Sequence, residues 1–255
     1  MFYRKSILFL LTLLFSMTTC LAQETKESLT EKAVLAFHQG DLTASIAYFD
    51  QLITKYPNDS SAYFDRGFVK GVNQDIEGAI VDYTRQISIN NESIDSYFLR
   101  GIMYQKLGKN QLAIEDYKEV TKMEWDNADA HYFKGQCELI LNQKRRSLKS
   151  YKSCVKVNPL HTEALLELAK AYQQKRRIKK SLETLAQGIV ADSSNANFYF
   201  YSGFIEAHYR KNYHKAIEFY NIAIQLVPDE VSYAEERENC LILLKKDKHF
   251  NFIPY

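Results

Sequence analysis

The residues of this 255-residue chain that most often carry out chemistry, its histidines and cysteines, are scattered along the sequence. The chain has six histidines and four cysteines, and none of them falls into a nucleophile, phosphate-binding or metal-ligand motif. His208 and His214 flank a polar stretch at a spacing that does not put two metal ligands on one helix face. We therefore predict no catalytic residue, no metal site and no cofactor, and we expect a protein that is not an enzyme.

Two of the cysteines could instead form a structural bridge. Cys137 and Cys154 fall in the two halves of one block of the repeat described below, and Cys154 stands in a column of mostly packing residues. A disulfide requires Cα atoms roughly 4.4 to 6.8 Å apart and an oxidising compartment. The sequence leaves two alternatives open, buried free thiols or a disulfide.

Small residues recur every 34 positions along the chain, and this period predicts the helices that position the side chains. An Ala or Ser follows each small residue 12 positions later, and a large side chain follows four positions after that, with one extra residue in the last block. The three columns are Ala33, Gly67, Gly101, Gly135, Ala169 and Gly203; Ser45, Ala79, Ala113, Ser147, Ser181 and Ala216; Phe49, Tyr83, Tyr117, Tyr151, Leu185 and Tyr220. We expect the extra residue in the turn YRKNYH.

Each block predicts a helix, a short polar turn and a second helix. Only 9 Gly and 4 Pro are present in a chain that is 46% hydrophobic, so the composition favours an all-α fold. Where two helices cross closely, a larger side chain would push their axes apart, so Gly or Ala is needed at the crossing. We expect the large side chain of the third column to fill the gap between consecutive blocks, because one block cannot bury its apolar face alone.

The third block carries Tyr97, Gly101, Tyr104, Ala113 and Tyr117 at a spacing that resembles the tetratricopeptide repeat, with Tyr97 in place of the usual Trp. The resemblance implies a right-handed α-solenoid of helix-turn-helix units that covers nearly the whole chain. The expected repeats are residues 26–59, 60–93, 94–127, 128–161, 162–195 and 196–230. A capping helix and tail follow at 231–255, with Val231, Ala234, Leu241 and Leu244 as its apolar positions.

Arginine and aspartate occur together in two blocks. Arg66 and Arg100 stand before the small residue in the blocks that also carry Asp82 and Asp116, whereas blocks without the Arg have no Asp there. We predict a helix-to-helix salt bridge; the alternative is that the arginines bind a ligand.

The family resemblance also implies a binding surface, because the first helices of such repeats line a concave groove that holds a peptide or a partner helix. The groove residues carried over to this sequence are Phe37, Phe64, Phe68, Phe98, Ile102, Tyr132, Gln136, Phe200 and Phe204. The alternative is that these aromatics pack between helices. The Lys, Asn and Arg set with which some members clamp a terminal carboxylate has no counterpart here.

A second surface is strongly basic. From Asn142 to Lys180 there are twelve basic and two acidic residues, and two clusters fall at the same phase of adjacent blocks. We name this set the basic edge: Lys144, Arg145, Arg146, Lys175, Arg176, Arg177, Lys179 and Lys180. It could attract anionic lipid, acidic glycans or an acidic protein, or it could be a solvated surface. No nucleic-acid motif accompanies it.

The first 22 residues predict an export leader. Arg4 and Lys5 precede an apolar run from Ile7 to Phe15, and Ala22 suits cleavage before Gln23. The alternatives are lipid modification at Cys20 and a retained membrane anchor. Removing residues 1–22 takes away two basic residues, so the remaining 31 basic residues balance 31 acidic ones.

We therefore predict a non-catalytic, exported scaffold, periplasmic or secreted, that binds a protein or peptide partner in the groove. The alternative is an envelope-surface binder, peripherally associated, that acts through the basic edge. A third hypothesis, an accessory domain of an enzyme, would need roughly 100 further residues for a catalytic domain. The sequence does not identify the partner or the oligomeric state.

Overall fold

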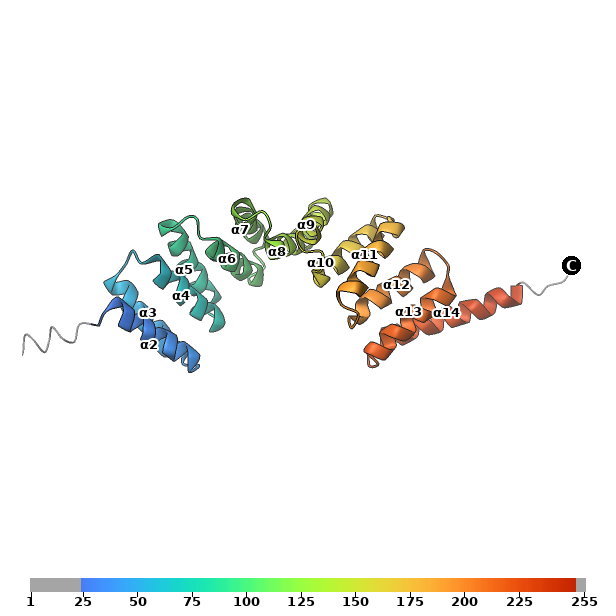
Figure 1. Cartoon of the computed structure of the whole chain (residues 1–255), viewed down its shortest axis with the longest axis horizontal. Coiled ribbons are helices and arrows are strands. Elements are labelled where there is room, and N and C mark those ends of the chain that lie inside the picture. The colour runs from blue at the N-terminus through green and yellow to red at the C-terminus, as the bar shows by residue number, and fades with distance from the viewer. Residues whose placement is uncertain (1–23, 251–255) are drawn as a thin grey trace, which may run out of the picture. The chain divides into compact units, whose positions relative to one another are not determined.

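The computed structural model describes residues 24–250, and all regular secondary structure in that range is α-helical (Figure 1). The predicted leader, residues 1–22, and the end of the tail, residues 251–255, lie outside the described residues. The described residues divide into two compact units, which meet between Gly108 and Lys109 of the sequence. The predicted all-α fold of tandem helix pairs is confirmed.

Within each unit, every helix packs on the helix that follows it in the chain. The first unit contains α2 (Lys26–His38), α3 (Leu42–Lys55), α4 (Ser60–Val72), α5 (Ile76–Ile89) and α6 (Ile94–Lys106). The second unit contains α7 (Asn110–Met123), α8 (Ala128–Ile140), α9 (Lys144–Val157), α10 (Thr162–Gln174), α11 (Ile178–Ala191), α12 (Ala196–His208), α13 (Tyr213–Leu226) and α14 (Val231–Phe250).

Helix and turn lengths account for the period of the sequence. The first helix of a pair, such as α4, has 13 residues, and the second, such as α5, has 14. Turns of three residues within a pair and four residues between pairs complete a repeat of 34. Asp41 and Asp75 cap second helices by accepting backbone N–H bonds, which satisfies donors that a helix N-terminus leaves without partners.

The turn inside each pair contains one residue with a left-handed backbone. These residues are Gly40, Gln74, Gly108, Asn142, Arg176 and Lys211, with φ between 53° and 81°. The Asp75 N–H closes its turn on the Lys70 carbonyl, five residues back, whereas the Asn212 N–H reaches the Glu206 carbonyl, six residues back. The predicted extra residue of the last repeat therefore lies in the α12–α13 turn, as expected.

The glycine column meets the aromatic column of the same helix pair. A Cβ added at Gly135 would lie 2.7 Å from Tyr151 Cε1, and one at Gly203 would lie 2.8 Å from Tyr220 Cε1. Both tyrosines are buried. The sequence predicted that this aromatic fills the gap between consecutive blocks; the structure shows in addition that its ring packs on the glycine of its own block.

The junction between α11 and α12 has an unusual distribution of side-chain volume. At the four preceding junctions the buried column of the second helix carries Leu52, Gln86, Val120 or Cys154, and the residue ten positions later is a small Ala62, Ser96, Ala130 or Ala164. At this junction the sizes are reversed, with Gly188 followed by Phe198, which is 0% exposed. A Cβ at Gly188 would lie 2.1 Å from Phe198 Cε1. At this junction α12 therefore supplies the large side chain, and α11 supplies the small one.

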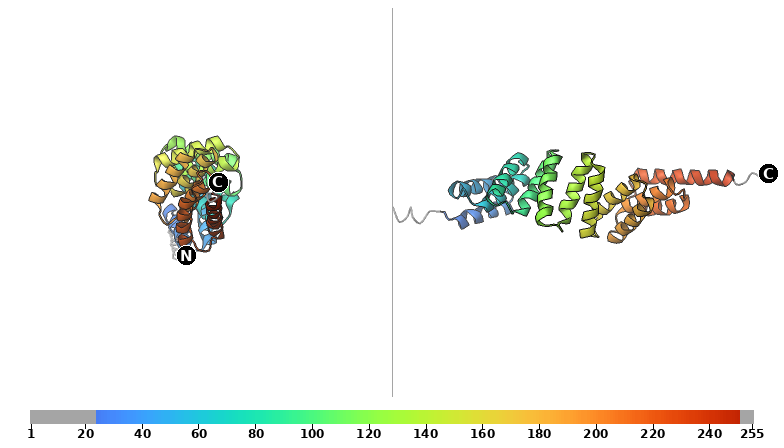
Figure 2. Two further views of the ribbon diagram at one scale, coloured as in Figure 1. Left: turned by 90° about the vertical axis from the view of Figure 1, so that its right-hand side faces the viewer. Right: turned by 90° about the horizontal axis from the view of Figure 1, so that it is seen from above.

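Helix α14 packs on α12 and α13, and its C-terminal part extends past them (Figure 2). Tyr233 and Cys240 form its buried face, whereas Val231 is 65% exposed. The prediction that Val231 belongs to the apolar face of this helix was wrong, because Val231 is the first residue of the helix and its side chain is exposed, whereas Tyr233 in the same turn is buried. Among the described residues, no helix combines the length and the apolar character needed to cross a membrane.

Candidate functional site

The predicted groove residues lie on the first helices of the pairs, and we call the surface that these helices form within each unit its first-helix face: α2, α4 and α6 in the first unit, and separately α8, α10 and α12 in the second. In the first unit, Phe37 of α2 and Phe68 of α4 have ring centroids 5.8 Å apart. Phe68 remains 42% exposed. These two rings therefore form an aromatic surface that solvent, or a partner, can reach.

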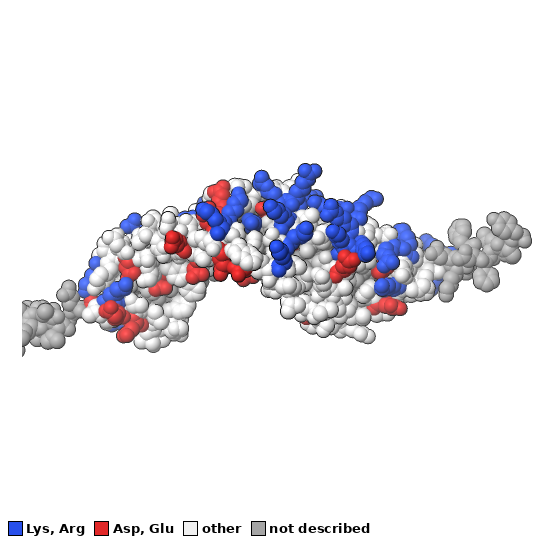
Figure 3. Space-filling view, turned by 45° about the horizontal axis from the view of Figure 1, so that its top comes forward, with Lys and Arg blue, Asp and Glu red and all other residues white. Residues whose placement is uncertain are grey.

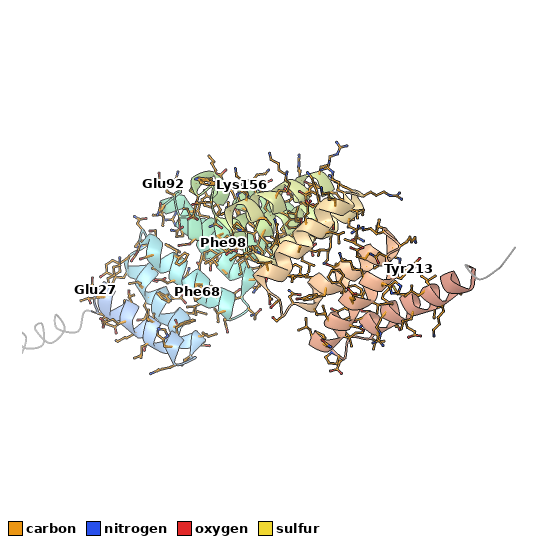
Figure 4. The ribbon with its side chains drawn as sticks, turned by 45° about the vertical axis from the view of Figure 1, so that its right-hand side comes forward. Glu27, Phe68, Glu92, Phe98, Lys156 and Tyr213 are labelled. Carbon is orange, nitrogen blue, oxygen red and sulfur yellow. The ribbon has the colours of Figure 1, made fainter. Side chains whose placement is uncertain are left out.

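The other predicted residues of this unit are more deeply packed. Phe64 and Ile102 pack against the buried cluster of Ala79, Tyr83 and Met103, and Phe98 of α6 is half-buried (Figure 4). Phe64 and Ile102 thus serve the core as well as the surface.

In the second unit, Tyr132 and Gln136 line a shallow surface hollow of about 590 Å³ that is open to solvent, beside the α9–α10 turn. Gln136 Nε2 donates to the Tyr132 hydroxyl at 2.7 Å, and the His161 ring lies 4.8 Å from the Tyr132 ring. Burial, helped by the nearby Glu163, raises the pKa of Tyr132 to about 12, so the hydroxyl stays protonated at neutral pH. We call this space the Tyr132 cavity.

His161 was not among the predicted site residues. It occupies the N-cap position of α10, where its Nδ1 lies 3.3 Å from the Ala164 backbone nitrogen and 3.2 Å from Glu163 Oε2, and its Nε2 lies 3.4 Å from Asp129 Oδ1. The sequence could have singled out His161, because the corresponding position of the other repeats, 34 residues apart, holds a small residue of the type that suits an N-cap. These residues are Thr25, Asp59, Ser93, Asn127 and Asn195. A histidine in that column marks a departure from simple capping.

Phe200 and Phe204 of α12 lie where α14 packs. The Phe200 ring stacks on Tyr233 of α14 with centroids 4.8 Å apart. The Phe204 ring lies 4.2 Å from His208, which hydrogen-bonds to Glu236 of α14 at 3.1 Å. The last helix therefore occupies part of the surface that the sequence assigned to a ligand.

The predicted Arg–Asp salt bridge is present in the first unit. Arg66 of α4 donates from Nε to Asp82 Oδ2 at 2.9 Å and from Nη2 to Asp82 Oδ1 at 2.5 Å. Lys70 Nζ lies 2.8 Å from the same carboxylate, and Asp50 Oδ1 accepts from Arg66 Nη1 at 2.6 Å. Because Asp82 is 0% exposed, this network is structural, and the Arg66 guanidinium is already occupied.

All eight residues of the basic edge are exposed. Within the described part of the chain, none of them forms a salt bridge, and Lys and Arg side chains gather over the region of α9 to α11 (Figure 3). Lys144 and Lys175 line the same small cavity of about 160 Å³, so the two clusters meet at one edge. Cations in the first turns of α9 and α11 face the positive ends of those helix dipoles, which disfavours them energetically.

Cys137, Cys154 and Cys240 are free and buried, so the disulfide alternative was wrong. Burial raises the pKa of the Cys137 and Cys154 thiols to about 12, which makes them poor nucleophiles. Over residues 24–250, no cluster of three or more His, Cys, Asp or Glu side chains could hold a metal ion.

Comparison with known families and structures places these observations in context. A tetratricopeptide-repeat model matches residues 94–126, and another matches residues 21–60. No curated protein matches the sequence.

Several solved structures share the fold. The C-terminal part of a TPR repeat-containing protein from Cytophaga hutchinsonii is similar with a TM-score of 0.71 at 16% identity, over 88% of this chain and 89% of that one. PilF of Pseudomonas aeruginosa gives 0.67 at 11% identity, over 84% and 97%. YrrB, described as a TPR protein with an unusual peptide-binding site, gives 0.65 at 20% identity, over 74% and 97%. At these identities the likeness shows the fold alone.

Proposed function

Because this chain is a tetratricopeptide-repeat protein, and that fold generally mediates protein–protein interaction, we propose that it is a non-catalytic adaptor that binds a protein or peptide on its first-helix face. The observation that carries the proposal is the Tyr132 cavity. Its walls combine the Tyr132 and Phe133 rings with the polar groups of Gln136 and His161. Such a mixture suits an extended peptide, whose side chains need apolar contacts and whose backbone needs hydrogen-bonding partners.

The charges at the cavity narrow the class of peptide. Asp129 and Glu163 line it and are exposed, so its rim is acidic. A segment with a basic residue beside an apolar one is complementary to this rim. The exposed Phe68, whose ring lies against the partly buried Phe37, provides a separate apolar contact in the first unit. The YrrB structure, described as having an unusual peptide-binding site, supports peptide binding by this fold.

A pull-down with chemical cross-linking tests the proposal. Phe68→Asp places a charge on the first-helix face, and Val81→Asp makes the same change at a 65% exposed position of α5, on the opposite side of the pair. Both variants are first checked for unchanged helical content by circular dichroism. We expect Phe68→Asp to lose a partner band that Val81→Asp keeps; equal capture by the two variants would overturn the assignment of the face.

Export belongs to the same proposal. The leader predicted at residues 1–22 would carry the adaptor out of the cytoplasm, to a periplasmic or secreted location. The intact mass of the protein purified from its own cells tests this. A chain that begins at Gln23 supports soluble export, a lipid-modified Cys20 supports an anchored form, and an intact Met1 would contradict cleavage.

A second candidate function is peripheral binding to an anionic surface through the basic edge. The observation in its favour is that eight exposed cations lie together without acidic partners among the described residues. Co-sedimentation with anionic lipid vesicles tests it, using Lys175→Gln/Arg176→Gln/Arg177→Gln against Lys106→Gln/Lys109→Gln/Lys118→Gln. Binding that fades with salt and is lost only in the first variant would support this function.

A further inference from the structure

Exposed carboxylates of the second unit gather at the turns that join one helix pair to the next. They lie in the α7–α8 turn and in the first turns of α8 and α10, and we call this set the acidic edge: Glu124, Asp126, Asp129 and Glu163. Of the cations beside it, Lys122 pairs with Glu119 at 3.0 Å, and Lys156 is exposed in the last turn of α9. Even with Lys156 and His161 charged, this edge keeps a surplus of negative charge.

The basic edge lies at the opposite ends of the same helices. α9 begins at Lys144 and has 14 residues, so its other end lies about 20 Å away. α10 runs in the other direction, from Glu163 in its first turn to Lys175 directly after its last residue. The sequence contains no acidic residue in 139–162 or in 168–182. The second unit therefore carries opposite charges at two edges that are one helix length apart.

The two edges have the same spacing of charges, because the same repeat builds both. Asp129 of α8 and Glu163 of α10 are 34 residues apart and occupy equivalent positions of adjacent repeats. Arg145 of α9 and Lys179 of α11 are also 34 residues apart. Each pair is thus separated by one step of the solenoid. When the basic edge of one chain meets the acidic edge of another, two cations can face two carboxylates in register.

This match selects a second copy of the chain as the partner. An unrelated acidic protein would have to reproduce the spacing, whereas a second copy already has it. The chain has 31 acidic residues and, without residues 1–22, 31 basic ones, so net charge does not keep copies apart. Trp125 in the α7–α8 turn is 69% exposed, and indole is the ring that arginine prefers. We propose that chains associate head to tail, with the basic edge of one chain docked on the acidic edge of a second copy.

The association has two physical consequences. The two docking surfaces differ, so every added copy leaves one edge unoccupied at each end, and the assembly can grow beyond a dimer. The charges are exposed, so salt weakens the contact. Asp129 and Glu163 also line the Tyr132 cavity, so a docked copy and a peptide compete for the same rim. The inference concerns part of the surface used in the proposed function, but it does not depend on peptide binding.

Sedimentation velocity of the purified chain measures the association. The Debye length falls from about 10 Å at about 0.1 M salt to about 3 Å at about 1 M salt. At the lower salt concentration we expect the weight-average mass to rise with protein concentration beyond that of a dimer, and at the higher one to return to that of a monomer. A chain that stays monomeric at low salt, or an assembly that high salt does not weaken, would overturn the proposal.

Two charge-reversal variants locate the interface. Arg145→Glu/Arg146→Glu changes the basic edge, and Glu124→Lys/Asp126→Lys changes the acidic edge without altering a residue that lines the Tyr132 cavity. Because like charges then meet, each variant alone should self-associate roughly tenfold more weakly or less than that. An equimolar mixture should recover the parent affinity, chiefly as dimers, because the intact basic edge of one variant meets the intact acidic edge of the other. A mixture that does not recover it would contradict the proposal.

A matched control separates docking from net charge. Lys245→Glu/Lys246→Glu makes the same change of charge as the basic-edge variant, at two exposed positions of α14 that belong to neither edge. It should associate like the parent chain; an equal loss in this control and in the basic-edge variant would overturn the proposal. Phe68→Asp should also leave self-association unchanged while it removes the partner band, so failure of this inference and failure of the proposed function are distinguishable.

Discussion

The reversed volumes at the α11–α12 junction predict a strong coupling between Gly188 and Phe198. A Cβ at Gly188 would lie 2.1 Å from Phe198 Cε1, which is about 1.4 Å closer than the shortest comfortable carbon–carbon contact. The Phe198 ring cannot swing aside, because it is 0% exposed. We expect Gly188→Val alone to lower the free energy of unfolding by about 1 to 3 kcal/mol through overpacking.

Phe198→Ala alone removes a buried ring and leaves a cavity, with a cost of about 3 to 5 kcal/mol. If the two effects were independent, the double variant would lose about 4 to 8 kcal/mol. The double variant, however, places Val before Ala, the combination found at Val120 and Ala130. We expect it to lose less than about 2 kcal/mol, because the valine fills the space that the ring leaves.

Urea unfolding followed by circular dichroism measures the four free energies of this double-mutant cycle. The double variant must be more stable than Phe198→Ala. If the losses in the free energy of unfolding of the two single variants add up in the double variant, the interpretation that Gly188 leaves room for the Phe198 ring is refuted. A changed dependence on urea concentration would point instead to an altered folded or unfolded state.

Four further predictions concern other positions. Gly71→Ala is expected to raise the free energy of unfolding by up to about 1 kcal/mol, because its Cβ would lie 3.6 Å from Met103 Cε, an ordinary contact, and Ala favours helix; a loss on urea titration would contradict this. Asp82→Ala should lower the free energy of unfolding by about 3 to 5 kcal/mol, because it leaves Arg66 and Lys70 without their buried carboxylate. Asp50→Ala should lower it by less than about 1 kcal/mol, because the Asp50 side chain is 54% exposed. Lys211→Gly should raise the stability of the fold by up to about 1 kcal/mol, because glycine adopts the left-handed backbone at this position, with φ of 57°, without strain. Gly108→Lys should lower the stability instead, and thermal melts of both variants measure the two changes. Burial raises the pKa of the Cys137 and Cys154 thiols to about 12, so the two thiols stabilise the fold fully below their unfolded-state pKa of about 8.5 and lose this contribution as the pH rises from there toward 12. The free energy of unfolding of Cys137→Ala/Cys154→Ala should therefore fall less between neutral and alkaline pH than that of the parent chain.

The sequence predicted those parts of the fold that repeat. Columns at a fixed period determine helix number, the position of close crossings and the Arg66–Asp82 pair, because each column records the same local environment several times. The extra residue before Ala216 was also predictable, since it shifts every later column by one position.

Features that occur once were harder to predict. Phe200 belongs to the same column as Phe64, yet α14 covers it through Tyr233. Which side of α14 is buried depends on the surface it meets, so the apolar position Val231 was assigned wrongly. Glu206 Oε2 accepts no hydrogen bond from a described residue, whereas Glu138 Oε2, at the same place in the fourth repeat, accepts one from the Ser150 hydroxyl. The sequence did not predict this difference, because only the structure shows which side chain each glutamate contacts.

The packing of each helix on its chain neighbour has a consequence for how the protein folds. Nearly all contacts within a unit join segments close in sequence, so contact order is low and little loop-closure entropy opposes folding. Helix pairs can form early and extend one pair at a time, and opening can begin at an end without disrupting the middle. Hydrogen exchange should therefore rise gradually toward the termini of each unit rather than change all at once.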